Sequence, residues 1–485
     1  MTAPPRLPAP TRLILGPFNR VEGDLEVTLD VSEGVVQAAQ VTAPLFRGFE
    51  TILAGRAPAD ALVVAPRVCG ICSVSQSAAA AGALARLAGI EAPPNGRLAA
   101  DLVLACENLA DHVTHFALFF MPDFARAAYA GRPWHATVRE RYAAGRGRSQ
   151  QRLVAARARL LHLLGLLAGK WPHSLALQPG GTTRAVDGGE RIRLMGILAE
   201  FRECLEEVLF AGPLDEVAAL DSPAALARWA DAAPDSRGDF RLFLAIARDL
   251  ELDRLGRGPA AFLSHGGFGL WPAGTLMDGI GGPLDTAQMR EDPAHSWMAG
   301  PPAHPADGTT VPDADKPGAY SWCKAPRLAG RPAEVGALAR HAVAGDPLAR
   351  GLVGNGGGSV RDRVVMRLVE AARLLIAMEG WVRRLTPGEP FCHDAPLPED
   401  GAAAGLVEAA RGALGHWLTV RRGVIHNYQI VAPTTWNFSP RDQDGQPGPL
   451  EQALAGTPVQ PGEDTPLAVQ HVVRSFDPCM ACTVH

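Results

Sequence analysis

Near the N-terminus, apolar and polar residues alternate with the period of a β-strand. The segment "LILGPFNRVEGDLEVTLDVSEGVVQAAQV", which begins at Leu13, alternates in this way and then turns at "SEG". The apolar positions are Leu25, Val27, Leu29 and Val31, and the polar ones are Asp24, Glu26, Thr28 and Asp30. This pattern predicts a β-hairpin with one face in solvent.

Helical spacing dominates the rest of the chain. Segments rich in Ala, Leu and Arg repeat apolar residues at helical intervals over residues 98–120, 151–168, 190–210, 360–381 and 405–418. Connectors rich in proline and glycine separate them, above all residues 259–317. We therefore expect an α+β fold that is predominantly α-helical, with an N-terminal β-hairpin or small sheet. Residues 1–12 are expected to form a disordered arm.

Composition excludes several classes of function. The chain has 485 residues, 47% of them hydrophobic and 20% charged, with a net charge of -5 and no basic run that would neutralise phosphates. Nucleic acid and anionic membrane surfaces are therefore not expected partners. The most apolar stretches, near residues 77–90 and 160–169, are shorter than a span of about 20 residues or broken by charge. The start "MTAPPRLPAP" has no apolar signal region, so we expect a cytoplasmic protein.

Two cysteine pairs carry the candidate chemistry. Cys69 and Cys72 stand in "RVCGICSVSQ", and Cys479 and Cys482 stand in "DPCMACTVH" at the other end of the chain. A spacing of i and i+3 lets two sulfurs face one ion. If both pairs share a site, residues 13–485 form a single domain, because dividing the chain would separate them.

Four interpretations of these cysteines remain open from the residues alone. Zinc ribbons keep their pairs roughly 15 to 20 residues apart, and a thioredoxin-like motif needs a βαβ unit, so both are disfavoured. Two unrelated pairs would leave the terminal position of the second unexplained. Four thiolates together would favour nickel, iron, copper(I) or zinc, and would need compensating positive charge. Arg67 and Arg411 are the candidates for that charge.

Several motifs in order resemble the large subunit of nickel-iron (NiFe) hydrogenases along nearly the whole chain. They are "RVEG" at 20–23, "FRGFE" at 46–50, "RVCGIC" at 67–72, "DHVTHF" at 111–116, "ARGALGHW" at 410–417, "NYQIVAPTTWN" at 427–437 and "DPCMACTVH" at 477–485. The resemblance implies the single-domain large-subunit fold of that family, with a deeply buried nickel-iron centre.

The resemblance also implies the ligands of that centre. Cys69 and Cys479 would be terminal nickel thiolates, and Cys72 and Cys482 would bridge nickel and iron. Iron would carry carbon monoxide and two cyanides. An open metal position would polarise dihydrogen as a Lewis acid while a nearby base takes the proton.

Four further residues would support this chemistry in the family pattern. The base would be a terminal thiolate or Arg411, and Glu22 would pass the proton outward. Without the resemblance, a carboxylate such as Glu22 at a strand start would simply be solvated. Asp111 and Asp477 would orient Arg411 through charge-assisted hydrogen bonds.

A second metal is implied at the C-terminus. His485, the carboxylate of Glu50 and a backbone carbonyl around Ile430 would hold a magnesium ion that fixes the tail inside the protein. Histidine is an unusual ligand for so hard a cation, which leaves the identity of the ion open.

Departures from the usual pattern point to the hydrogen-sensing, or regulatory, branch. Gln76 stands where most members carry a histidine, and an amide can donate to a thiolate but cannot titrate near neutral pH. Ile71 and Phe119 would narrow a gas channel, or else simply fill the core. The sequence also shows no extension after His485, where maturing catalytic subunits usually carry one.

Electrons from dihydrogen must leave a buried centre, and the four remaining cysteines lack cluster-binding spacing. A small subunit with iron-sulfur clusters is therefore expected. In the sensory branch, this heterodimer would pair with a second copy of itself and with a histidine kinase. The leading expectation is a slow hydrogen-sensing subunit. The alternatives are an energy-converting uptake hydrogenase in its processed form and a structural zinc protein.

Overall fold

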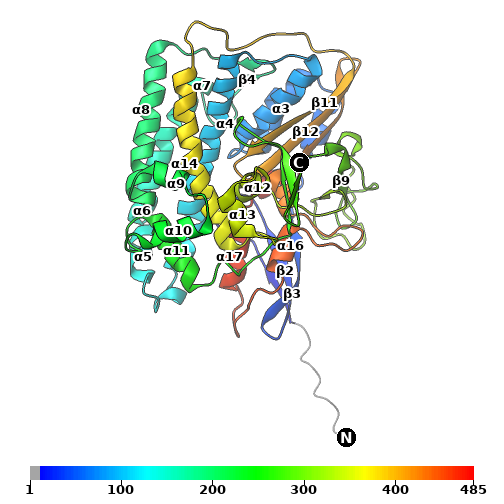
Figure 1. The fold of residues 1–485 in the computed structure, drawn as a ribbon. Coiled ribbons are helices and arrows are strands. Elements are labelled where there is room, and N and C mark those ends of the chain that lie inside the picture. Colours follow the sequence, from blue (N-terminus) through cyan, green and yellow to red (C-terminus); the bar gives the residue numbers. More distant parts are fainter. Residues whose placement is uncertain (1–10) are drawn as a thin grey trace.

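Two long helices, α4 (Pro94–Thr114) and α14 (Val360–Arg384), pack against each other in the helical part of the molecule (Figure 1). The structure is a computed structural model and describes residues 11–485. α8 (Gly188–Cys204) and α9 (Leu214–Ala218) also pack on α14. Ser359 caps α14 in a reciprocal capping box with Asp362, which defines its first turn. Buried residues lie on all sides of α14, so its position is fixed by packing.

The remaining helices are shorter. They are α1 (Phe49–Leu53), α2 (Ala61–Val64), α3 (Ser73–Ala88), α5 (His135–Tyr142), α6 (Arg148–Leu160), α7 (His162–Ala168), α10 (Pro223–Asp231), α11 (Asp239–Asp249), α12 (Ala337–Val343), α13 (Pro347–Val353), α15 (Pro433–Asn437), α16 (Pro449–Leu454) and α17 (Leu467–Ser475). The predominantly helical α+β class predicted from the sequence is confirmed.

The N-terminal sheet has three antiparallel strands, β1 (Thr11–Leu15), β2 (Glu26–Ser32) and β3 (Val35–Thr42), in that order. The predicted turn is present, since Glu33 and Gly34 take the left-handed backbone that a tight hairpin needs. Val27, Leu29 and Val31 are buried, as the alternation predicts. Thr11 and Arg12 belong to β1, which corrects the end of the predicted arm; residues 1–10 lie outside the described part.

Within residues 11–485, the remaining strands form four further antiparallel sheets. Their members are β4 (Leu177–Gln178) with β5 (Gly181–Thr182), β6 (Ala261–Ser264) with β7 (Gly274–Met277) and β8 (Ile280–Gly282), β9 (Met289–Asp292) with β10 (Ala325–Leu328), and β11 (Gly401–Ala409) with β12 (Gly412–Arg421) and β13 (Val424–Val431). The last sheet packs against α3 (Figure 1).

Four of the five predicted helical segments are helical. Residues 98–120 correspond to α4 followed by a π-helical turn at His115–Phe120, and residues 190–210 to α8 followed by another at Leu205–Phe210. Residues 360–381 correspond to α14. The segment 151–168 is divided at Leu161 into α6 and α7.

The predicted helix over residues 405–418 is wrong, because this segment forms the hairpin of β11 and β12. β12 is the central strand and is buried on both faces, so the alternation that marks a strand is absent. Gly405 allows the close crossing of α3, since a Cβ there would lie 1.8 Å from the carbonyl oxygen of Ala79. Arg411 consequently stands in the two-residue turn of a hairpin.

The C-terminal residue lies inside the body of the molecule (Figure 1). His485 is only 5% exposed. No helix within residues 11–485 is long and apolar enough to cross a membrane.

Candidate metal centre

Both cysteine pairs stand at the ends of helices. Cys69 follows a 3-10 turn at Ala65–Val68, and Cys72 is the N-cap residue of α3. On the other side, α17 ends at Ser475, and a left-handed residue, Asp477, redirects the chain toward Cys479. Cys482 ends a second 3-10 turn.

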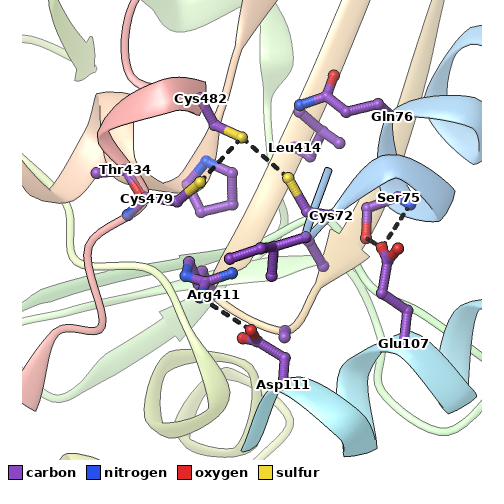
Figure 2. Close-up of a pocket in the computed structure, with 14 residues that line it drawn as sticks. Cys72, Ser75, Gln76, Glu107, Asp111, Arg411, Leu414, Thr434, Cys479 and Cys482 are labelled. Carbon is purple, nitrogen blue, oxygen red and sulfur yellow. Dashed lines mark hydrogen bonds and ion pairs between the residues drawn. The ribbon is translucent and has the colours of Figure 1, made fainter. Parts of the chain in front are cut away.

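These turns bring four sulfurs to one point. The sulfur of Cys69 lies 3.4 Å from that of Cys479, and the sulfur of Cys72 lies 2.9 Å from that of Cys482. Cys479 and Cys482 are 3.2 Å apart (Figure 2). All four sulfurs lie within 4.8 Å of one another, so one bimetallic nucleus could engage them all. We call this group the thiol cage.

The N-terminal loop pairs with the C-terminal segment and holds it in place. Glu22 and Cys479 form a parallel bridge in which the amide of Met480 donates to the carbonyl of Glu22 at 2.7 Å. Gly23 permits this approach, since its φ is +78° and a Cβ there would lie 3.0 Å from the backbone nitrogen of Ala481. The "RVEG" motif therefore positions the second cysteine pair.

Arg47 and Thr434 were given no role by sequence reasoning, although both fall in quoted motifs. Arg47 donates to the carbonyl of Val68 at 2.5 Å and to that of Ala481, so it joins the two cysteine segments. Thr434 accepts a hydrogen bond from the amide of Cys479 at 3.1 Å. Only the tertiary structure shows which carbonyls and amides these side chains meet.

Glu107 is another residue that the sequence did not single out. Its carboxylate accepts from the amides of Val74 and Ser75 at 2.8 and 2.9 Å, and from the indole of Trp171 at 3.0 Å. It thereby caps α3, whose own N-cap side chain, Cys72, belongs to the cage. Burial raises the pKa of Glu107 to about 7 against the pull of these donors.

The cysteines of the thiol cage differ in their pKa values. Hydrogen bonds from Cys479, Cys482 and Cys72 lower the pKa of Cys69 well below its usual value. Burial, with the neighbouring sulfurs, raises the pKa of Cys482 well above it. Four buried thiolates are not stable next to one another without a cation to compensate their charge. The four sulfurs therefore suit a soft metal centre, which would replace their protons on binding.

A fixed guanidinium lies beside the cage. Arg411 donates to the carboxylate of Asp111 at 2.9 Å (Figure 2). It also donates to the carboxylate of Asp477 at 3.2 Å and to the carbonyl of Asp477 at 2.8 Å. Burial opposes the ionisation of Asp477, but the charge of Arg411 above all lowers its pKa to about 2. Burial acts to lower the pKa of Arg411, but the charges of Asp111 and Asp477 outweigh it and raise the pKa well above its usual value, so the guanidinium stays charged.

Arg67 does not compensate the cage. It is exposed and donates to the carbonyl of Val63 one helical turn earlier. Its position next to Cys69 in the sequence was misleading, because its side chain leaves the backbone on the solvent side. Of the two arginines expected to compensate the charge of the thiolates, only Arg411 is buried.

Glu22 lies between the cage and solvent. It is half-buried, and its pKa is raised by burial and then by the charge of Cys69, while Arg411 and Arg47 act in the opposite direction. A carboxylate with these neighbours can accept and release a proton near neutral pH more readily than an exposed one.

A small cavity adjoins the cage. Its lining includes Ile71, Gln76 and Arg411 together with three of the cysteines. Phe119, which was expected to narrow a gas channel together with Ile71, belongs to the π-helical turn at 115–120. Among the described residues it does not line this cavity. The narrowing of a gas channel by Ile71 and Phe119 stays a prediction.

The residues predicted to hold a magnesium ion are partly assembled. The carboxylate of Glu50 is buried and accepts from the amide of Ile430 at 2.8 Å. Burial raises the pKa of Glu50, and the ammonium of Lys324 acts against this. Nε2 of His485 is buried without a partner in the described residues. An orphaned imidazole nitrogen and a buried carboxylate fit a bound cation.

Comparison with known proteins identifies the class to which this fold and cage belong. Residues 47–139 and 151–485 match the nickel-dependent hydrogenase family. The chain belongs to this family and is the large, catalytic subunit of a nickel-dependent hydrogenase, which implies a small-subunit partner.

Individual relatives cover almost the whole chain. The periplasmic NiFeSe hydrogenase large subunit of Desulfomicrobium baculatum is 30% identical over 100% of this chain and 96% of its own length. The hydrogenase-2 large chain of Escherichia coli K12 is 28% identical over 98% and 97%. The solved NiFeSe hydrogenase of Desulfovibrio vulgaris Hildenborough in the reduced state has a TM-score of 0.82 at 28% identity, covering 98% of this chain and 100% of that one.

These relatives support the assignment to the hydrogenases, but not the narrower assignment to the hydrogen-sensing branch. None of the three names refers to hydrogen sensing. Selenium in two of the names does not extend to this chain, whose four cage positions are all cysteine.

Proposed function

We propose that the chain oxidises dihydrogen by heterolytic cleavage and passes the electrons to an iron-sulfur small subunit. The observation that carries this proposal is the meeting of four thiols from both ends of the chain beside a fixed guanidinium. Cys69 and Cys479 would be terminal nickel ligands, and Cys72 and Cys482 would bridge to an iron that carries carbon monoxide and two cyanides.

When bound, the nickel-iron centre supplies a Lewis-acidic position and a redox couple. The chain supplies the rest. Arg411 holds positive charge at the cavity wall, and Asp111 and Asp477 keep its orientation constant. A terminal thiolate takes the proton, and Glu22 moves it toward solvent. Arg411, the other base that the family pattern offered, keeps its own proton and so cannot take a second one. Apolar neighbours such as half-buried Ile71 and buried Leu414 restrict water in the cavity.

A magnesium or similar divalent ion held by Glu50, the carbonyl of Ile430 and His485 would fix the C-terminal segment. The unpartnered Nε2 of His485 supports this part of the proposal. Such an ion would have a structural role, because none of these three residues lines the cavity beside the thiol cage.

The favoured role is hydrogen uptake that feeds an electron acceptor chain. It is supported by a relative whose name states an electron acceptor, the quinone-reactive Ni/Fe-hydrogenase large chain of Wolinella succinogenes, which is 26% identical over 98% of this chain.

Hydrogen sensing is the second candidate, and Gln76 is the observation that favours it. Gln76 is 1% exposed and lines the cavity, so a side chain that cannot titrate stands next to the reacting centre. A histidine kinase partner, a dimer of heterodimers and a cytoplasmic location remain predictions.

Turnover separates the two roles. The heterodimer would be purified without oxygen, and dye reduction by dihydrogen would be measured before and after exposure to air. Fast turnover that oxygen abolishes supports uptake, and slow turnover that survives oxygen supports sensing. Cys72→Ser is expected to abolish turnover, whereas Cys392→Ser, at an exposed cysteine, is not. Full activity in Cys72→Ser would contradict the proposed site.

A further inference from the structure

Three buried side chains form a hydrogen-bonded chain that ends beside the thiol cage. Gln76 belongs to α3, His416 to β12 and Tyr428 to β13. Oε1 of Gln76 lies 2.7 Å from Nε2 of His416, and Nδ1 of His416 lies 2.7 Å from the hydroxyl of Tyr428. Their exposed fractions are 1%, 0% and 1%. The hydrogen chemistry described above uses neither His416 nor Tyr428.

The direction of every hydrogen bond in this chain follows from its chemistry. His416 is fully buried and both partners of its ring are uncharged groups, so the imidazole is neutral and carries one proton. Because Oε1 of Gln76 can only accept, that proton is on Nε2. Nδ1 must then accept, and the hydroxyl of Tyr428 donates to it. Each donor therefore points toward the cage, and bonds aligned in this way polarise one another.

The far end of the amide faces the cage. Nε2 of Gln76 is buried and has no hydrogen-bond partner in the described residues. Figure 2 shows this nitrogen on the side of Cys482 and Cys72, with the oxygen turned away. A reversed amide would present its oxygen to negatively charged sulfurs, which repel it. A buried amide nitrogen without a partner is costly, and a thiolate would satisfy it.

We propose that His416 and Tyr428 are positioning residues that hold the Gln76 amide with its N–H groups toward Cys72 and Cys482, so that it donates to a sulfur of the loaded cage. This inference rests on the nickel-iron centre of the proposed function. A hydrogen bond to a sulfur withdraws electron density from the metals, as it does in iron-sulfur sites. Iron then returns less density to its carbon monoxide ligand, which raises that ligand's stretching frequency.

Infrared spectra of the intact heterodimer test the assignment. Gln76→Leu removes the donor and is expected to move the carbon monoxide band to lower frequency. His416→Phe, which keeps the ring but loses both hydrogen bonds, is expected to move it in the same direction. In the Gln76→Leu background, His416→Phe is expected to add no further shift. An unmoved band in His416→Phe, or an equal shift in both backgrounds, would overturn the assignment.

Two further variants keep the test decisive. Tyr428→Phe leaves the imidazole in place and is expected to give a smaller shift of the same sign, which remains measurable if His416→Phe does not fold. Tyr142→Phe is the matched control, because it removes the hydroxyl of another buried tyrosine, bonded to Asp239 at 2.5 Å. A shift in this control as large as that of Tyr428→Phe would count against positioning. Absence of the band in the unaltered protein would contradict the nickel-iron centre itself.

Discussion

Arg411 and Glu22 both lie close to the thiol cage, but they are buried to different degrees and therefore have different roles. Arg411 is 4% exposed and is held by two aspartates, so neither its charge nor its position can vary much. Glu22 is half-buried and has a raised pKa, so it can exchange a proton with water. At the residue scale, a fixed charge and a titrating group are thus both placed close to the thiol cage.

Replacing Glu22 tests the proton exit. Glu22→Gln keeps the size of the side chain but removes its ability to carry a proton, so dihydrogen oxidation is expected to fall by roughly 10²-fold or more. The iron-bound carbon monoxide band is expected to persist. Asp24→Asn, an exposed neighbour, is the control and is expected to keep full activity. Unchanged dye reduction in Glu22→Gln would rule out this route.

Replacing Arg411 tests the fixed charge. Arg411→Lys keeps one positive charge but cannot contact Asp111 and Asp477 together, so the turnover rate is expected to fall by about 10²-fold. Metal content is expected to be retained, because the four cysteines are untouched. The matched variant Arg67→Lys changes an exposed arginine and is expected to be neutral. Equal rates in the two variants would contradict a role for the buried guanidinium.

The elements that can be predicted from the sequence are those whose apolar residues repeat with the period of the element. β2 alternates and α14 repeats apolar residues at helical spacing, and both form as expected. β12 was mistaken for a helix, because it is buried on both faces and contains alanine and leucine. The cysteines and Arg411 could be found from short motifs. Arg47 and Glu107 could not be assigned roles, since their partners belong to other segments of the chain.

The loop at Gly23 tests how the two ends of the chain meet. Gly23→Ala introduces both a left-handed alanine and a contact with the C-terminal segment. Gly55→Ala is the matched control, because Gly55 has a similar φ of +80° but nothing within 4 Å of a Cβ. The control is expected to lose about 1 kcal/mol of unfolding free energy. Gly23→Ala is expected to lose more and to bind less nickel. Equal losses, measured by denaturant unfolding and metal analysis, would contradict the close contact.

At the scale of the whole molecule, the metal centre joins the first and last parts of the chain. The N-terminal loop pairs with Cys479, α3 carries Cys72, and His485 lies buried near the same region. Coordination would therefore stabilise the long-range contacts of the C-terminal segment, because ligand binding to the folded state stabilises it.

Amide hydrogen exchange tests this coupling. The amide of Met480, which donates to Glu22, and those of its neighbours are expected to exchange slowly in the metal-loaded protein. After removal of the metals these amides are expected to exchange faster, while those of α14 change little. Equal protection of residues 477–483 with and without metals would show that the tail is held independently of the centre.

The most direct test of the central claim is the metal content and infrared spectrum of the same purified sample. Four thiols that bind one bimetallic centre predict one nickel and one iron per chain, with bands from iron-bound carbon monoxide and cyanide that disappear in Cys72→Ser. One zinc per chain, with neither nickel nor those bands, would contradict it.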